Sequence, residues 1–551
     1  MTEQPSSNTS ADAQLASGVN QLNLRAAAPA FIPRASAQAF VPRARQQPAA
    51  SAPTAPASSP APTSAPVPAP APAPAKPAAA AAAAATPASS TSATPSIRPS
   101  PSPAATAEVD REEQILLDEH YKEHFNLVFI GHVDAGKSTL GGNILYLTGM
   151  VDKRTLEKYE REAKEAGRES WYLSWALDTS NEERAKGKTV EAGRAFFETD
   201  KRRYTILDAP GHKSFVPNMI GAATQADIGV LVISARRGEF ETGFDRGGQT
   251  REHAMLAKTN GVNRLIVVIN KMDDPTVNWS KERYDEIIAS LHPFLKKSGY
   301  PGKSDLVFLP ISGFSGANVK DPVGKDVCPW WDGQTLLGTL DTMQAVNRKI
   351  NAPLRLPLTG KYKEMGTMLL GKIESGHVKK GQAILIMPNQ RKCEVLGVYI
   401  EEDEVPMAVC GDNVRLKVKG VDEEDVQVGF VISDVNSPIK AVSQIDVQLR
   451  VLDIDNIISA GFTAVMHLHT AVEEVTLTQM ICGVDSKTGK RVKKAPGFLT
   501  KNHQAVVRFE ITQQVAVDTY KTFPNLGRFT LRDKGKTIGI GKVLKLIDGS
   551  A

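Results

Sequence analysis

The spacing of apolar positions changes along the chain and predicts two kinds of domain. From residue 125 to about residue 340, mostly apolar runs such as 125–130, 204–207, 265–269 and 306–311 alternate with stretches of helical character. Runs that are apolar on both faces and separated by helices are typical of a parallel sheet with helices on both sides. We therefore predict a doubly wound, mostly parallel α/β domain at residues 109–345, with functional loops at the carboxyl ends of its strands.

From about residue 353 the apolar runs become short and alternate with polar positions. Examples are 367–373, 383–387 and 414–418, and a second set spans about 445–546, all separated by glycines and charged turns. A period of two with frequent turns indicates β-barrels. The length allows two barrels, which we place at residues 346–440 and 441–551.

The first part of the chain shows neither pattern. Residues 1–105 hold 20 of the 35 prolines and a run of eight alanines at 78–85. Such a composition cannot bury enough apolar surface to offset the entropy of ordering, so we predict a disordered tail at residues 1–108. Its two aromatic residues, Phe31 and Phe40, lie in the near-repeats AFIPR and AFVPR. This repetition favours two docking anchors over incidental residues.

The junction and the charge balance add two expectations. Residues 109–124 (VDREEQILLDEHYKEH) predict a charged amphipathic helix that leads into the first strand.

The segment 1–105 carries six basic and two acidic residues, which leaves 60 basic and 59 acidic residues in the remainder. A near-neutral body does not favour binding of nucleic acid through bulk charge, and we predict no sequence-specific nucleic-acid binding. Without a long apolar run or a signal-like start, the expected location is cytoplasmic, with no membrane partner.

Five short stretches at strand ends predict a guanine-nucleotide switch, and the first is GHVDAGKS at residues 131–138. It fits the pattern G-x-x-x-x-G-K-[ST], in which backbone N–H groups and a helix N-terminus surround phosphate oxygens. Lys137 would reach the β- and γ-phosphates, and the Ser138 hydroxyl would bind Mg²⁺. We expect the helix to begin near Thr139. The candidate GTP-binding residues here are His132, Val133, Asp134, Ala135, Gly136, Lys137, Ser138 and Thr139.

Two further stretches predict recognition of the base. NKMD at 270–273 follows the run 265–269, and SGF at 312–314 follows the run 306–311. The Asp273 carboxylate can accept hydrogen bonds from the guanine N1–H and exocyclic amine, a donor pair that adenine lacks, so the site favours GTP over ATP. The candidate base-binding residues are Asn270, Lys271, Asp273, Ser312, Gly313 and Phe314.

The remaining two stretches predict the chemistry. In DAPGH at 208–212, Asp208 would lie near Mg²⁺, Gly211 would offer its N–H to the γ-phosphate, and His212 would orient the attacking water. Thr189 lies about fifty residues after Ser138, behind a long insertion that suggests a switch read by a large partner. The candidate catalytic residues are His212, Gly211, Thr189 and Lys137, and the candidate metal ligands are Ser138, Thr189 and Asp208.

Longer strings resemble the translational GTPases of the elongation factor 1 alpha type, and within them the eukaryotic class-II peptide chain release factors. These strings are EERAKGKTVE at 182–191, SARRGEFETGFDRGGQTREHA at 234–254, ESGHVKKGQ at 374–382, and GRFTLRD at 527–533 followed by GKT at 535–537. The resemblance extends almost continuously over residues 109–551.

This resemblance implies a function in translation termination with GTP or GDP and Mg²⁺ as ligands. The GTP-bound form would carry the class-I release factor to ribosomes at stop codons, and hydrolysis would let that factor accommodate for peptide release. The implied surface for the class-I factor is Gly527, Arg528, Phe529, Thr530, Leu531, Arg532 and Asp533. The tail resembles motifs, centred on Phe31 and Phe40, that bind poly(A)-binding protein, and mRNA-surveillance factors are further candidate partners.

The residues leave several alternatives open. A ribosome-rescue GTPase, an aminoacyl-tRNA-delivering elongation factor and a GTPase subunit of sulfate-activating enzymes share the motifs, although the tail and the GRFTLRD string favour termination. A scaffold that binds GTP without hydrolysis is disfavoured by His212, Thr189 and Lys137. By the resemblance, many elongation factors have an apolar residue where Lys188 stands, as part of a gate on the histidine. We therefore hypothesise that His212 is instead mispositioned until partners order residues 170–190.

Overall fold

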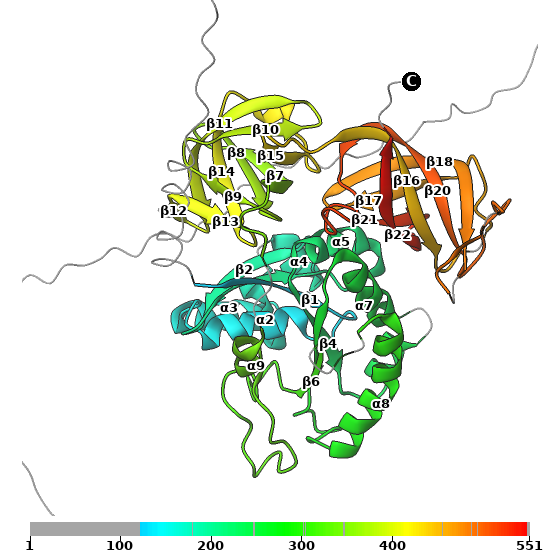
Figure 1. Ribbon diagram of the computed structural model, residues 1–551. Helices are drawn as coiled ribbons and strands as arrows, with labels where there is room; N and C mark the ends of the chain where they lie inside the picture. The colour runs from blue at the N-terminus through cyan, green and yellow to red at the C-terminus, as the bar shows by residue number, and fades with distance from the viewer. Residues whose placement is uncertain are drawn as a thin grey trace, which may run out of the picture. The chain divides into compact units, whose positions relative to one another are not determined.

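The structure is a computed structural model that describes residues 122–178, 180–245, 248–300, 302, 305–344, 348–454, 456–485, 488–492 and 494–547 (Figure 1). The predicted tail at 1–108, with Phe31 and Phe40, lies outside the described residues, as does the predicted helix from 109 to 121. The predicted end of that helix is wrong. Lys122 and Glu123 have no regular structure and His124 begins a strand, because it pairs with Arg203 of the neighbouring strand.

The first domain is built on a sheet with the strand order β2-β3-β1-β4-β5-β6. Neighbouring strands are parallel except for β2, which runs antiparallel to β3. The chain passes from β1 to β3 on one side and then to β4 on the other, so the order reverses at β1, where doubly wound folds bind ligands. The strands are β1 (His124–Ile130), β2 (Gly193–Glu198), β3 (Arg203–Asp208), β4 (Ile228–Ser234), β5 (Arg264–Asn270) and β6 (Leu306–Pro310).

Both faces of this sheet are buried, which explains its uniformly apolar strands. Along β1, Val128 belongs to the hydrophobic core on one face, whereas Leu127 and Phe129 belong to the core on the other. The helices are α2 (Lys137–Leu147), α3 (Lys153–Glu165), α4 (Asn181–Lys186), α5 (Val216–Gln225), α6 (Glu239–Phe244), α7 (Gln249–Asn260), α8 (Lys281–Ser298) and α9 (Leu336–Thr342), with short 3₁₀ helices η1 (Glu169–Trp171), η2 (Ser174–Ala176) and η3 (Lys213–Phe215). These layers confirm the predicted doubly wound fold.

The second and third units are closed barrels, as the alternating runs predicted. In the first barrel, β10-β15-β7-β8-β14-β11 form a ring because β10 also pairs with β11. Its strands are β7 (Arg355–Lys363), β8 (Thr367–Lys372), β9 (His377–Lys379), β10 (Ala383–Met387), β11 (Arg391–Ile400), β12 (Asp403–Val405), β13 (Met407–Val409), β14 (Asn413–Lys419) and β15 (Val431–Asp434), with η4 at Glu423–Asp425. Closure removes the exposed strand edges that would otherwise pair with other chains.

The second barrel closes in the same way, since β17 also pairs with β18 in the ring β17-β21-β22-β16-β20-β18. Its strands are β16 (Ala441–Val451), β17 (Thr463–Leu468), β18 (Ala471–Val484), β19 (Arg491–Val492), β20 (Gln504–Ala516), β21 (Arg528–Asp533) and β22 (Lys536–Ile547). Both predicted barrels are therefore confirmed as architecture. None of the helices in the described residues is long and apolar enough to cross a membrane.

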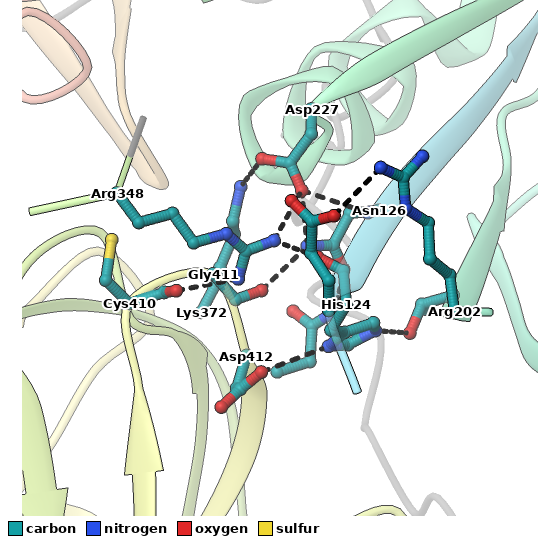
Figure 2. Close-up of polar contacts among 12 residues, drawn as sticks. His124, Asn126, Arg202, Asp227, Arg348, Lys372, Cys410, Gly411 and Asp412 are labelled. Atoms are coloured by element: carbon teal, nitrogen blue, oxygen red, sulfur yellow. Dashed lines mark hydrogen bonds and ion pairs between the residues drawn. The ribbon is translucent and has the colours of Figure 1, made fainter. Parts of the chain in front are cut away.

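A buried polar cluster joins the start of the sheet to the first barrel (Figure 2). Asp227, just before β4, pairs with Lys372 of β8 at 2.8 Å, and Asn126 donates to the Gly411 carbonyl at 2.8 Å. Burial alone would raise the pKa of Asp227, but the charges of Lys372 and Arg348 more than offset it and hold that pKa below its usual value. Removing one member of such a pair would leave a buried charge without compensation. The cluster therefore fixes the barrel to the end of the sheet opposite the β1 carboxyl end.

Two buried histidines in the second barrel predict a loss of stability in acid. Burial lowers the pKa of His467 and of His469 to about 4, and His469 Nε2 donates to the Ala516 carbonyl at 2.9 Å. Because the unfolded chain binds these protons near the ordinary pKa of 6.5, stability is full above pH 6.5 and is lost as the pH falls toward 4. Each histidine should contribute about 2 kcal/mol less to stability at pH 5 than at pH 7.

The measurement is the unfolding free energy of the full chain by urea denaturation at pH 7 and pH 5. The variant His469→Asn should lose about 2 kcal/mol less than the unmodified chain between these pH values. The exposed His292 supplies the control, and His292→Asn should behave as the unmodified chain does. Equal losses in all three proteins would contradict the assignment of a buried neutral ring to His469.

Candidate nucleotide-binding site

The loop after β1 has the backbone of a phosphate-binding turn. Gly131 and Gly136 have φ angles of 145° and 91°, and Gly136 caps α2 at its N-terminus in the left-handed region that favours glycine. The helix begins at Lys137 rather than near Thr139 as predicted, since the left-handed residue is the last one before the helix. Lys137 is buried and its Nζ donates to the His132 carbonyl at 2.8 Å, which holds the ammonium beside the loop. Burial lowers the pKa of Lys137, although the nearby Asp208 partly offsets this.

The loop after β3 passes directly against this turn. A Cβ atom at Gly211 would lie 2.6 Å from Lys137 Nζ and 3.0 Å from the Val133 backbone nitrogen. A side chain there would displace the Lys137 ammonium and press on the loop backbone at Val133, so close packing favours the glycine of the D-x-x-G stretch. The Gly211 backbone is thereby placed next to the group that would bind the γ-phosphate.

The predicted metal ligands converge beside the same turn. Ser138 Oγ lies 3.2 Å from Thr189 Oγ1, although the two residues come from different switch segments. Asp208 is completely buried, and neither of its carboxylate oxygens has a hydrogen-bond partner among the described residues. Burial raises its pKa to about 6. An unpartnered carboxylate next to two hydroxyl groups supplies hard oxygen donors, which fit Mg²⁺.

Sequence reasoning missed a second carboxylate at this position. Asp178 lies within the insertion, is buried, and accepts from Thr189 Oγ1 at 3.5 Å. Burial and the charge of Asp208 raise its pKa to about 7. The Asp178 carboxylate therefore adds a further hard oxygen donor beside Thr189, of the kind that fits Mg²⁺. No local motif marks Asp178; only its place in the folded insertion reveals it.

In the base-recognition stretches, some polar side chains stabilise the loops and another remains available to bind a base. Asn270 donates to the Ala135 carbonyl at 2.9 Å and accepts from the Gly313 backbone N–H at 2.7 Å, so it ties the phosphate loop to the SGF loop. Lys271 pairs with Glu239 at 2.7 Å. Asp273 is exposed, and no hydrogen bond or ion pair involves it among the described residues. Its carboxylate is therefore available to a base.

These loops enclose a cavity of about 720 Å³. The predicted residues that line it are Val133, Asp134, Gly136, Lys137, Ser138, Thr139, Thr189, Gly211, His212, Asn270, Lys271, Asp273, Ser312 and Phe314. The predicted residues His132, Ala135, Asp208 and Gly313 do not line it. His132 and Ala135 line a neighbouring cavity, whereas Asp208 and Gly313 are buried behind the walls. The size and the polar lining suit a nucleotide.

The long insertion forms one wall of this cavity, which sequence reasoning did not predict. Ser170, Trp171 and Ser174 line it together with Lys188. The Arg184 side chain donates to the Asp178 and Trp175 carbonyls at 2.8 and 3.1 Å, so it holds the insertion together. Arg236 lines the cavity and is paired with Asp274 at 2.5 Å.

The candidate catalytic histidine is held by its own turn. His212 Nδ1 accepts from the Ser214 backbone N–H at 3.3 Å, and its ring lies 5.9 Å from that of Phe215. Because a backbone N–H can only donate, the neutral ring carries its proton on Nε2. A ring with Nε2–H can hydrogen-bond and orient a water molecule.

The string proposed to bind the class-I factor forms β21, a strand of the second barrel. Phe529, Thr530 and Leu531 are fully buried, and Arg532 is nearly so. Thr537, opposite Arg532, donates to Glu252 of α7 at 2.8 Å. In this arrangement, only Arg528 and Asp533 of the strand are part-exposed. Most of the string therefore serves the barrel core and the contact with the first domain.

In comparisons with known protein families, all three units of the chain have matches. Residues 122–352 match the family described as the elongation factor Tu GTP binding domain, residues 366–433 match elongation factor Tu domain 2, and residues 444–544 match the GTP-eEF1A C-terminal domain-like family. These matches correspond to the α/β domain and the two barrels.

Individual relatives agree with this assignment. The eukaryotic peptide chain release factor GTP-binding subunit of Kluyveromyces lactis is 57% identical over 428 residues, which are 78% of this chain and 61% of that protein. The subunit of Zygosaccharomyces rouxii is 56% identical over 428 residues, which are 78% of this chain and 65% of that protein. The matched region thus spans less than two thirds of each curated relative.

A solved structure shows the same fold at lower identity. The S. cerevisiae Ski7 GTPase-like domain, bound to GDP and inorganic phosphate, aligns with a TM-score of 0.65 at 18% identity, covering 79% of this chain and 99% of that one. At this identity the likeness concerns the fold alone. The family matches and the release-factor relatives go further: the chain belongs to the translational GTPases of the elongation factor Tu and elongation factor 1 alpha type, and it is a homologue of the eukaryotic peptide chain release factor GTP-binding subunits.

Proposed function

We propose that this chain is the GTPase of translation termination. The observation that supports it most is the convergence of the five predicted stretches on one cavity, in a chain more than half identical to release-factor subunits over most of its length. In this proposal the GTP-bound form carries the class-I release factor to a cytoplasmic ribosome at a stop codon. Poly(A)-binding protein, through Phe31 and Phe40, and mRNA-surveillance factors are proposed as further partners.

The proposed chemistry uses the side chains around the cavity. Lys137 and the backbone of residues 133–138 bind the phosphates, and the Gly211 N–H detects the γ-phosphate. Ser138 and Thr189, with Asp208 nearby, would hold Mg²⁺, which neutralises charge on the β- and γ-phosphates when bound. His212 orients the attacking water through Nε2–H. Loss of the γ-phosphate removes the contacts that order Thr189 and Gly211, so the partner is released.

The titration of GTP with candidate partners tests this proposal. If the class-I factor prefers the GTP state, thermodynamic linkage requires it to tighten GTP binding, typically by about 5- to 150-fold. We expect this tightening with a class-I release factor and no change with aminoacyl-tRNA. The measurement is the equilibrium affinity for a fluorescent GTP analogue, with the GDP analogue as the control.

The opposite pattern would assign a different function. If aminoacyl-tRNA alone tightened GTP binding, the chain would be an elongation-type carrier. The assignment of residues 527–533 to binding of the class-I release factor would then be wrong. If the partner raised the affinities for GTP and GDP equally, it would not distinguish the GTP-bound state from the GDP-bound state.

A further inference from the structure

One segment of the second barrel concentrates positive charge in an otherwise balanced region. Residues 486–501 (SKTGKRVKKAPGFLTK) contain six basic and no acidic residues. The rest of residues 441–551 contains nine basic and ten acidic residues. The entire positive excess of this region is therefore carried by sixteen consecutive residues, which we call the basic segment. A run of this kind is either a solvated face or a binding surface for polyanions.

The basic segment is held by the barrel at both described ends. At its start, β19 pairs with the end of β18, and Asp485 closes the turn by donating its N–H to the Lys490 carbonyl at 3.0 Å. Near its end, Leu499 exchanges backbone hydrogen bonds of 2.8 and 3.0 Å with Ile458. Leu499 and Ile458 are both buried. The barrel thus presents the segment from fixed points, which lowers the entropy lost on binding.

Three basic side chains of this segment have no acidic partner among the described residues. Lys490, Arg491 and Lys494 are exposed, and among the described residues they make no ion pair and no side-chain hydrogen bond. Other cations do have acidic partners: Arg508 of β20 pairs with Asp446 at 2.8 Å, and Lys501, the last residue of the segment, pairs with Asp453 at 2.7 Å. Three adjacent unpaired cations repel one another, and an anionic partner would remove that cost.

Exposed apolar side chains accompany these charges. Phe498 is 53% exposed and Ile457 is 57% exposed. Both precede a residue of the buried Ile458–Leu499 bridge, so they point to the face opposite that bridged pair. An exposed aromatic ring beside cations is the combination on which nucleic-acid bases stack while phosphates are neutralised.

We propose that the basic segment is an RNA-binding surface. Lys490, Arg491 and Lys494 contact phosphates, and Phe498 stacks on an unpaired base. This surface lies on the barrel, and it neither includes nor requires the nucleotide cavity. RNA fits better than an acidic protein because the cations are dispersed over an exposed surface and no cavity lies among them in the described residues, so recognition rests on a repeating charge.

The test is binding of the full chain to a fluorescent RNA hairpin with an unpaired loop, by anisotropy at several salt concentrations. The triple variant K490A/R491A/K494A should weaken binding at least roughly tenfold and lower the salt slope by about two units. Phe498→Ala should weaken it roughly fivefold or more, whereas Phe498→Trp should retain binding. The control K164A/K296A/K297A removes the same charge from exposed positions of α3 and α8 and should leave binding within about twofold.

Each other outcome would overturn the proposal. Equal weakening by the triple variant and its control would show that total charge alone governs binding. Unchanged RNA binding in the triple variant, with lost binding to polyglutamate or to anionic lipid vesicles, would assign the surface to an acidic protein or to a membrane. Because GTP affinity is measured on the same samples, failure of the RNA surface is distinguishable from failure of the nucleotide site.

Discussion

Replacing Asp273 by asparagine should lower the affinity for GTP by about 10³- to 10⁴-fold and raise the affinity for xanthosine triphosphate. In the NKMD stretch, Asn270 and Lys271 are already engaged by Gly313 and Glu239. Within this stretch, the Asp273 carboxylate lines the cavity and has no hydrogen-bond or ion-pair partner among the described residues. It is therefore the group that can read the guanine donors.

The size of the effect follows from unpaired polar groups. Guanine offers two donors to a carboxylate, and an asparagine can satisfy at most one of them, which leaves the other desolvated without a partner. Xanthine has a carbonyl where guanine has the exocyclic amine, and that carbonyl can accept from the asparagine amide. The same exchange should leave ATP excluded, because the adenine edge offers neither pattern to this position.

The measurement is a competition of GTP, XTP and ATP against a fluorescent GDP analogue. Asp274→Asn is the matched control, since Asp274 is the adjacent carboxylate but is occupied by Arg236 and Thr276. We expect that variant to keep the preference for GTP. An Asp273→Asn variant that still selects GTP over XTP would show that the base binds elsewhere.

The sequence predicted those parts of the site that depend on local pattern. Four of the five candidate loops follow a mostly apolar run, and each of these runs became a buried strand whose carboxyl end faces the cavity. The expectation was wrong for Thr189, which follows the helix α4. The strand boundaries differ by one or two residues. The alternation of apolar and polar residues after residue 353 likewise predicted both barrels. Short strands with this alternation form few other architectures in a chain of this length.

The remaining features depend on contacts between distant residues. Asp178 reaches Thr189 only because the insertion folds back against α4. The pairing of Asp227 with Lys372 spans 145 residues and belongs to no motif. The burial of Phe529 likewise follows from the barrel's closure, whereas the string containing it suggests an exposed surface. Buried polar pairs of this kind satisfy each other's hydrogen-bonding needs, and a single sequence does not reveal which partners meet.

Replacing His212 by alanine should reduce stimulated GTP hydrolysis by about 10²- to 10⁴-fold and leave GTP affinity unchanged within about threefold. The ring lines the cavity, and its Nδ1 accepts from the Ser214 N–H. Nε2–H is the remaining polar group of the neutral ring, and it serves to position water. A positioning group acts on the hydrolysis step and contributes little to ground-state binding.

The comparison of stimulated and isolated rates tests how the histidine is restrained. We propose that its own turn, rather than a gate at residue 188, keeps His212 from the nucleotide in the isolated chain. Lys188 is exposed and cannot act as an apolar barrier. Lys188→Val should therefore change the isolated rate by less than about threefold, since a new apolar residue adds to a restraint that is already complete.

Single-turnover hydrolysis, measured with and without ribosomes and the class-I factor, separates these effects. His212→Ala should lose the stimulated rate and leave the isolated rate low, and His212→Gln should recover part of the stimulated rate because an amide can also orient water. His292→Ala, an exposed histidine on α8, is the control for the loss of an imidazole. Substantial turnover by the isolated, unmodified chain would contradict the restraint, because it would place His212 in a productive position before any partner had ordered residues 170–190.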